Sequence, residues 1–199
     1  MKPGYKLYRC CFRLARAAIG IFYRIRVFGK ENIPEGAALI CANHSSMIDP
    51  FLIAFAFGID NQMHIIAKAE IFRIPVISPL LKKLGMISVN RGVLDANSVK
   101  VTFAYLNGNE KVAVFPEGTR VSSDDAISAK AGSVKIAERT GAPIVPVFMP
   151  RKKPLFRRVP VRIGKPYYID KQAQKRSADD YSRLSDDLME RIKFLNPIS

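Results

Sequence analysis

Residues 37–57 decide the fold, and they run AALICANHSSMIDPFLIAFAF. The first part, Ala37–Cys41, is a short apolar run of the kind that forms a buried strand. A helix is expected from residue 46 or 47 to Phe57, because Asp49 and Pro50 both suit the first turn of a helix. A buried strand that leads directly into a helix is the repeating unit of an α/β protein.

The rest of the chain repeats this alternation. Further strands are expected at 26–28, 63–67, 86–89, 111–115, 143–148 and 159–163, and further helices at 5–24, around Leu80–Leu84, and at 98–106, 129–140 and 178–194. Pro146 indicates that the strand 143–148 is irregular or lies at an edge. The pattern predicts an α/β fold with a mixed, largely buried sheet that is flanked by helices.

The composition suits one folded domain with an anionic partner. The 199 residues are 48% hydrophobic and 25% charged, which is enough apolar material for a sizeable core. The 32 Lys and Arg outnumber the 17 Asp and Glu, so the net charge is +15. That charge is consistent with nucleic acid, a phospholipid surface or a phosphorylated substrate. The three cysteines have no metal-ligand spacing and fit a reducing compartment.

The first 24 residues are expected to form a basic amphipathic helix at a membrane surface. Apolar residues recur there at spacings of three and four, and no acid occurs before Glu31. Such a helix suits the headgroup region of an anionic bilayer, and the alternative is a helix packed on the domain with a solvated basic face. We therefore divide the chain into a membrane-surface helix, 1–24, and a folded domain, 25–199. No apolar run is long enough to predict a transmembrane helix.

His44 and Asp49 form the first group of candidate catalytic residues. They lie between the strand and the helix of the opening segment, a common place for active residues in an α/β sheet. On a continuous helix they would not share a face, but a loop-to-helix junction can fold the carboxylate back onto the imidazole. A carboxylate on one ring nitrogen leaves the other nitrogen free to act as a general base. The alternative is a polar histidine that merely caps the helix.

Residues 115–120, FPEGTR, form a second group after another apolar strand. Gly118 permits a tight turn, so that backbone N–H groups, Thr119 and Arg120 could converge on an oxyanion. Arginine suits phosphate because its planar guanidinium donates two parallel hydrogen bonds. Glu117 could orient Arg120 or accept a hydrogen bond from a substrate hydroxyl. A turn closed by an ion pair is the alternative.

Two weaker motifs complete the set. Residues 85–92, GMISVNRG, bring Arg91 to the end of a strand, and residues 144–148, IVPVF, could line an acyl groove. The four motifs together, in this order, resemble those of the glycerolipid acyltransferases typified by 1-acyl-sn-glycerol-3-phosphate (lysophosphatidic acid) acyltransferase. That family has a His-x4-Asp block, a block ending in Arg, a Phe-Pro-Glu-Gly-x-Arg block and an apolar Val-Pro block. The resemblance covers residues 27–163.

The resemblance implies that His44 and Asp49 are catalytic and that Arg91, Glu117, Gly118 and Arg120 bind a glycerol phosphate. It implies direct transfer of a fatty acyl group, from acyl-CoA or acyl carrier protein, to the sn-2 hydroxyl of 1-acyl-glycerol 3-phosphate. No metal or other cofactor is implied. The product would be phosphatidic acid, made at the cytoplasmic face of the cell membrane. We expect backbone N–H groups after His44 to stabilise the oxyanion.

Several alternatives stay open. The acceptor could be glycerol 3-phosphate or another lyso-lipid, and a non-catalytic lipid-binding relative would keep the same fold. A nucleic-acid partner is disfavoured, because no such motif is present and the basic residues flank apolar amphipathic segments. A second group of basic residues is expected to attract anionic headgroups or donor phosphates: Lys152, Lys153, Arg157, Arg158, Arg162 and Lys165. The acyl chain, the donor and the oligomeric state are left open.

Overall fold

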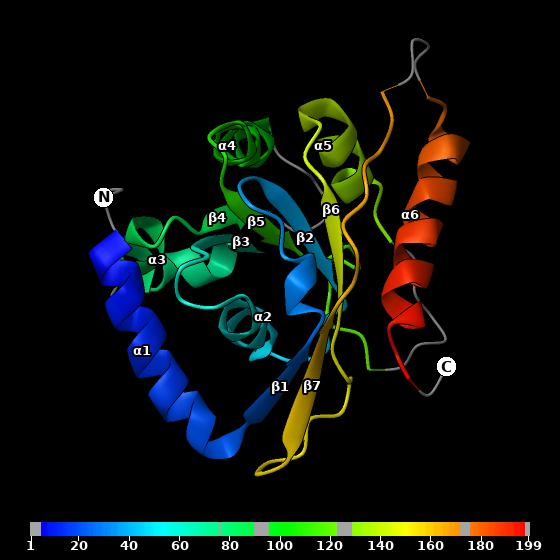
Figure 1. Cartoon of the computed structure of the whole chain (residues 1–199). Helices are drawn as coiled ribbons and strands as arrows, with labels where there is room; N and C mark the ends of the chain where they lie inside the picture. Colours follow the sequence, from blue (N-terminus) through cyan, green and yellow to red (C-terminus); the bar gives the residue numbers. More distant parts are fainter. Residues whose placement is uncertain (1–4, 76, 90–95, 123–128, 172–175, 198–199) are drawn as a thin grey trace.

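The computed structural model describes residues 5–75, 77–89, 96–122, 129–171 and 176–197. Its centre is a seven-stranded sheet with helices on both faces (Figure 1). In spatial order the strands are β1 (Arg24–Phe28), β7 (Arg158–Ile163), β6 (Ile144–Phe148), β2 (Ala38–Ala42), β5 (Lys111–Val114), β3 (Met63–Lys68) and β4 (Ile87–Val89). Neighbours are parallel except β6 and β7, so the sheet is mixed as predicted.

The helices form the two outer layers. They are α1 (Tyr5–Phe22), α2 (Asp49–Phe57), α3 (Ile77–Lys83), α4 (Ala96–Asn107), α5 (Gly132–Thr140) and α6 (Ala178–Phe194). Short 3₁₀ turns cover Lys30–Asn32 and Ala69–Arg73. In Figure 1, α1 and α2 lie on one side of the sheet, whereas α4, α5 and α6 lie on the other. The predicted fold class is therefore confirmed.

The central strand β2 shows why both faces of the sheet are buried. Successive side chains of a strand point to opposite faces. Ile40 packs in the core that contains Leu52 of α2, and Leu39 packs in the core that contains Val134 of α5 and Leu188 of α6. A strand with helices on both sides must be apolar at every position, which explains its continuous apolar sequence.

Pro146 does not mark an edge strand, so the edge alternative of that prediction was wrong. Strand β6 lies inside the sheet, between β7 and β2, and all of its residues are buried. The carbonyl of Pro146 accepts a hydrogen bond from Gly164 on the β7 side, so its nitrogen also faces that side. The β6–β7 ladder starts only at Val147, paired with Ile163, so no ladder bond requires a proline N–H.

Helix α1 contacts the domain through one side. Tyr8 is buried, and the ring of Phe12 meets Phe55 of α2 edge-on at 5.3 Å between centroids. Leu14 and Ile21, by contrast, are both 66% exposed. The expected basic amphipathic helix is therefore present, and it presents apolar side chains both to the domain and to its surroundings. No helix in the described ranges is long and apolar enough to cross a membrane.

Candidate active site

Three neighbouring parallel strands bring the candidate residues to one edge of the sheet. Strands β5, β2 and β6 lie side by side and point the same way, so the loops that follow them meet. His44 follows β2, Glu117 follows β5 and Arg151 follows β6. The carboxyl ends of parallel strands are where open α/β sheets place their ligands.

His44 and Asp49 are in direct contact. Asp49 is the first residue of α2, and its Oδ2 lies 3.0 Å from Nδ1 of His44. Oδ2 also accepts the backbone N–H groups of Ser45 at 2.7 Å and Ser46 at 2.8 Å. The junction therefore folds the carboxylate back onto the ring, as expected. Because the carboxylate accepts, Nδ1 carries the proton and Nε2 is left with the lone pair of a base.

The imidazole ring is also fixed on its flat side. It stacks on Phe115 with ring centroids 4.0 Å apart, and the backbone N–H of His44 donates to Oε2 of Glu117 at 2.9 Å. These contacts hold the ring before any substrate arrives. Such preorganisation is what a general base needs.

Lys153 completes the surroundings of Asp49. Its Nζ lies 2.9 Å from Oδ1 of Asp49 and donates to Oγ of Ser45 at 2.7 Å. The Lys153 side chain is only 3% exposed and that of Asp49 is fully buried. Burial acts to raise the pKa of Asp49, but the hydrogen bond from His44 and the Lys153 ammonium outweigh it and hold the pKa below its ordinary value.

The position of Lys153 corrects an expectation. A side chain this buried, with its ammonium on Asp49, cannot serve as surface attraction for headgroups or donor phosphates. Lys152, Arg157, Arg158 and Lys165 of the same predicted group are exposed.

Glu117 is paired with Arg151 and not with Arg120. Its Oε1 accepts from Nη2 of Arg151 at 2.6 Å, while its Oε2 accepts from the backbone of His44. Nη1 of Arg151 also donates to the carbonyls of His44, at 3.3 Å, and Val121, at 2.9 Å. The charge of the buried Glu117 carboxylate is thus balanced by Arg151. Through these contacts Glu117 connects the loops after β2, β5 and β6. That Glu117 contacts substrate stays a prediction, and the observed contacts give it a positioning role.

Asn43 ties the end of β2 to the start of the loop that carries Arg151 and Lys153. Its side-chain amide donates to the carbonyl of Met149 at 2.7 Å and accepts the Met149 N–H at 2.8 Å. These two hydrogen bonds extend the pairing of β2 and β6 by one residue, with a side-chain amide in place of a backbone amide. Asn43 is buried, so this clamp fixes where the loop begins.

The predicted phosphate-binding residues are placed unevenly. Gly118, at φ 66°, makes the expected tight turn, and its N–H donates to the carbonyl of Phe115 at 3.0 Å. Thr119 and Arg120 follow on the surface, both exposed. Arg91 lies outside the described residues. The N–H of Gly118 is used by the turn, so Thr119 and Arg120 are the members of this group that face outward.

The backbone N–H groups of the two residues after His44 do not serve as the predicted oxyanion donors. The N–H groups of Ser45 and Ser46 both point at Asp49 and are used by its carboxylate. They therefore position the acid and cannot also stabilise a developing oxyanion.

Arg151 was not predicted to be functional, and Lys153 was predicted to be a surface charge. Both belong to a basic, proline-rich stretch that looks like an ordinary charged loop. A signal exists only in hindsight, because two buried carboxylates, Asp49 and Glu117, require two buried cations.

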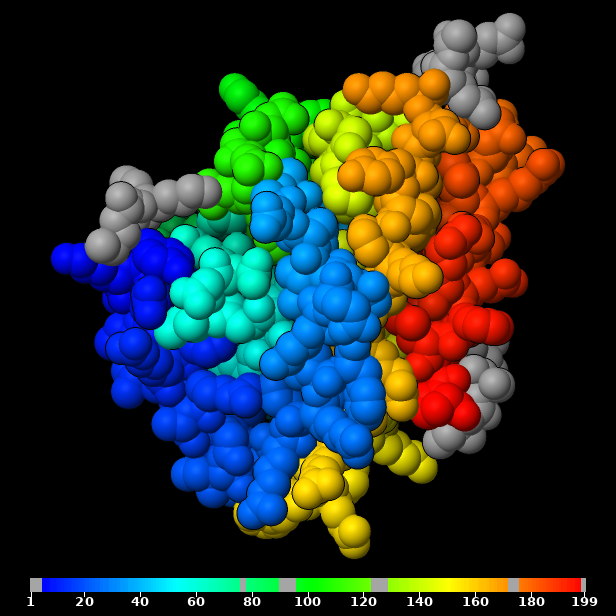
Figure 2. Space-filling view, in the orientation of Figure 1, coloured from blue at the N-terminus to red at the C-terminus, as the bar shows by residue number. Residues whose placement is uncertain are grey.

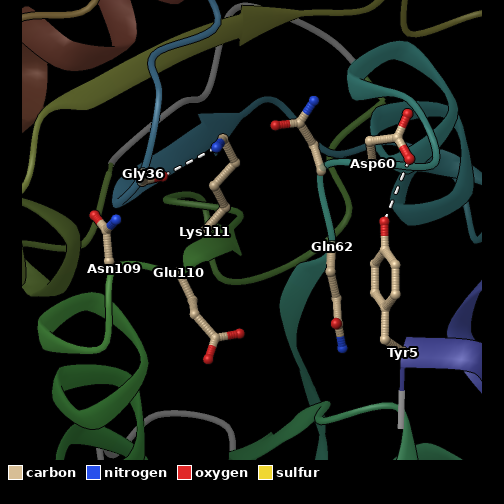
Figure 3. A pocket seen from close by; sticks show the side chains of 8 residues that line it. Tyr5, Gly36, Asp60, Gln62, Asn109, Glu110 and Lys111 are labelled. Atoms are coloured by element: carbon tan, nitrogen blue, oxygen red, sulfur yellow. Dashed lines mark hydrogen bonds between the residues drawn. The ribbon is translucent and has the colours of Figure 1, made fainter. Parts of the chain in front are cut away.

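A pocket of about 390 Å³ lies at the opposite edge of the sheet (Figure 3). Figure 3 shows Glu110 and Lys111 at the start of β5, Gln62 before β3 and Tyr5 of α1 around it. The side chain of Lys111 donates to the carbonyl of Gly36 at 3.0 Å. Since His44 follows the other end of β2, this pocket is not part of the site around His44.

Known proteins are similar to this chain in sequence and in fold. The model of the family described as Acyltransferase matches residues 24–150, which is most of the chain. The chain belongs to the acyltransferase family. The match begins where β1 begins and includes the loops that carry His44, Asp49, Glu117 and Arg120.

Individual acyltransferases agree with the family match. The 1-acyl-sn-glycerol-3-phosphate acyltransferase of Bacillus subtilis (strain 168) is 31% identical over 196 residues, which cover 95% of this chain and 96% of that protein. The enzyme of the same name from Borreliella burgdorferi is 33% identical over 147 residues, covering 72% of this chain and 57% of that one. The crystal structure of the LPA acyltransferase PlsC from Thermotoga maritima superposes with a TM-score of 0.69 at 26% identity, covering 96% of this chain and 78% of that chain.

Proposed function

We propose that this acyltransferase moves a fatty acyl group from a thioester to the sn-2 hydroxyl of 1-acyl-glycerol 3-phosphate, giving phosphatidic acid. The observation that carries the reaction is the preformed contact between His44 and Asp49, which leaves Nε2 of a fixed ring as a base. The relatives named for this acceptor support the choice of substrate. Acyl-CoA and acyl carrier protein both supply the thioester chemistry that the proposal needs.

The reaction consists of one transfer. Nε2 of His44 takes the proton of the acceptor hydroxyl, and the hydroxyl oxygen attacks the thioester carbonyl. Asp49 stabilises the imidazolium that forms. The C–S bond then breaks, the imidazolium of His44 returns the proton to the leaving sulfur, and the donor departs as a thiol. Because the nucleophile belongs to the substrate and the base is an imidazole, this step requires neither an acyl-enzyme nor a metal.

Arg120, with Arg91, is proposed to bind the phosphate of the acceptor. The guanidinium of Arg120 is exposed at the edge where His44 lies, in the loop that Glu117 anchors. A phosphate held there would bring the adjacent glycerol hydroxyl toward the base. Thr119 can donate from the same loop.

Replacing Arg120 with alanine is expected to raise KM for lysophosphatidic acid by roughly 10- to 100-fold, because charge-assisted hydrogen bonds of about 1.5–3 kcal/mol are lost. Steady-state kinetics with varied acceptor measure this change. Arg139→Ala is the matched control, since Arg139 is an exposed arginine at the far end of α5. An unchanged KM would remove Arg120 from the phosphate site.

Acceptor choice tests the proposed substrate directly. Lysophosphatidic acid, glycerol 3-phosphate and lysophosphatidylcholine should be compared at equal concentration, with product identified by mass spectrometry. We expect phosphatidic acid to dominate. A preference for glycerol 3-phosphate or for lysophosphatidylcholine would favour the alternative acceptors.

The enzyme is proposed to work at an anionic membrane surface, on its cytoplasmic face, where α1 attaches it. In α1, Leu14 and Ile21 are exposed on a helix whose described charged residues are all basic. Changing both to serine is expected to weaken sedimentation with anionic vesicles about tenfold. These exposed positions are better targets than deletion of residues 1–24, because Tyr8 and Phe12 pack on the domain. Unchanged sedimentation would contradict attachment through α1.

A further inference from the structure

The loop between β6 and β7 ends in an apolar tip beside the end of α1. Leu155 is 53% exposed and Phe156 is 64% exposed. The N–H of Phe156 donates to the carbonyl of Phe22 at 2.6 Å, and the two rings lie 5.7 Å apart. We call Leu155 and Phe156 the tip surface, which lies beside Phe22 at the end of α1. In Figure 2 the yellow loop and the blue end of α1 lie together at the lower edge of the molecule.

The backbone at Phe156 shows that the tip is held in place. Its φ is 60°, in the left-handed region that a bulky side chain rarely adopts. Such a conformation persists only where the surroundings impose it, and such sites are often functional. Here the N–H of Phe156 is bonded to the carbonyl of Phe22, and the ring stays mostly exposed. The contact therefore presents the ring to the surroundings and adds little to the core.

The charge around the tip surface selects the partner. Arg157 and Arg158 follow Phe156 directly and are exposed, as is Arg24, which pairs with Arg158 between β1 and β7. The sequence contains no Asp or Glu in residues 1–30 or 139–169, and the tip contact joins Phe22 of the first stretch to Phe156 of the second. Apolar side chains ringed by arginines match a bilayer with anionic headgroups. Nucleic acid would accept the arginines but offers no apolar phase for Leu155 and Phe156.

The tip surface lies on the same loop as the groups that hold the active site. Arg151 pairs with Glu117 and Lys153 pairs with Asp49, just before Leu155 in the chain. The loop leaves the sheet at the edge where His44 lies. A bilayer that receives the tip would therefore meet the edge of the molecule that carries the active site.

We propose that the tip surface inserts into an anionic bilayer, as a second attachment beside α1 that sets the active-site edge against the lipid. The benefit of this attachment for catalysis rests on the proposed function, because the lipid acceptor resides in that bilayer. The insertion itself is a physical event that can be measured without any acyl transfer. The two proposals can therefore fail separately.

The chain contains no tryptophan, so one introduced residue is an unambiguous reporter. The full-length Phe156→Trp protein is mixed with vesicles of phosphatidylglycerol and phosphatidylcholine. We expect its emission to move to shorter wavelength and to be quenched by lipids brominated in the acyl chain. Tyr168→Trp is the matched control, because Tyr168 is 66% exposed and follows Tyr167, which pairs with the start of β6 at the opposite edge. Sedimentation with vesicles but no spectral change at position 156 would overturn the proposal.

A second variant separates insertion from folding. Leu155→Ser with Phe156→Gly removes the apolar tip, and glycine suits a φ of 60°. We expect a melting temperature that is unchanged or higher, together with at least a tenfold loss of vesicle affinity. Turnover of a short-chain, monomeric lysophosphatidic acid should stay unchanged. Unchanged vesicle affinity would contradict the proposal, whereas intact insertion in a protein without acyl transfer would contradict only the proposed function.

Discussion

Replacing His44 with alanine is expected to lower kcat by roughly 10²- to 10⁴-fold, the contribution of a positioned general base. The reason is that the ring offers Nε2 as a base only because Nδ1 is held by Asp49 at 3.0 Å. Acceptor-dependent thiol release from an acyl thioester measures the loss. Binding of lysophosphatidic acid should be retained, since Arg120 and Thr119 are left in place.

Asp49→Asn is the companion variant. An amide of the same shape can no longer accept from every donor at Oδ2, where His44, Ser45 and Ser46 now converge. It can also fix the wrong tautomer of His44, and a loss comparable to that of His44→Ala is expected. Near-normal turnover in either folded variant would show that another group is the base.

Lys153→Met is expected to lower kcat by roughly 10- to 100-fold, with KM for the acceptor changed by less than about twofold. The methionine side chain fills similar space but leaves Oδ1 of Asp49 without its ammonium. An uncompensated buried carboxylate moves or takes up a proton, and in either case His44 loses its orienting partner. Lys152→Met is the control, since Lys152 is the adjacent and exposed lysine.

The pH dependence distinguishes this role from simple loss of stability. The pKa of Asp49 is held below its ordinary value in the folded enzyme, so the carboxylate stabilises the fold at neutral pH and loses that effect as pH falls through its folded pKa. Without Lys153 the folded pKa rises, and acid unfolding should begin at a higher pH than in the native protein. Lys153→Arg should restore part of kcat. Equal losses of kcat and of melting temperature, without that rescue or pH shift, would make Lys153 merely structural.

Local features were predictable from the sequence because they depend on neighbouring residues. The strand before His44 and the helix that begins at Asp49 follow from a run of apolar residues, a proline and an acid within one short stretch. The contact between the two residues spans only five positions. Helix α6, with Ser177 and Asp180 forming a capping box at its start, was predicted with its exact bounds.

The remaining features depend on contacts between distant parts of the chain. Lys153 reaches Ser45 across 108 positions, and Arg151 reaches His44 across 107. Nothing local to these basic residues distinguishes a buried ion pair from a solvated loop. Pro146 misled for the same reason, because whether a missing N–H matters depends on how far the ladder with β7 extends.

The most direct test of acyl transfer to lysophosphatidic acid is thiol release from palmitoyl-CoA and from palmitoyl acyl carrier protein by the purified enzyme in detergent. Lysophosphatidic acid is either present or omitted, and the lipid product is identified by mass spectrometry. We expect release that requires the acceptor, with one phosphatidic acid formed for each thiol. If a folded protein releases no thiol with either donor and any of the lyso-lipids tested, acyl transfer is contradicted and a non-catalytic lipid-binding role is favoured.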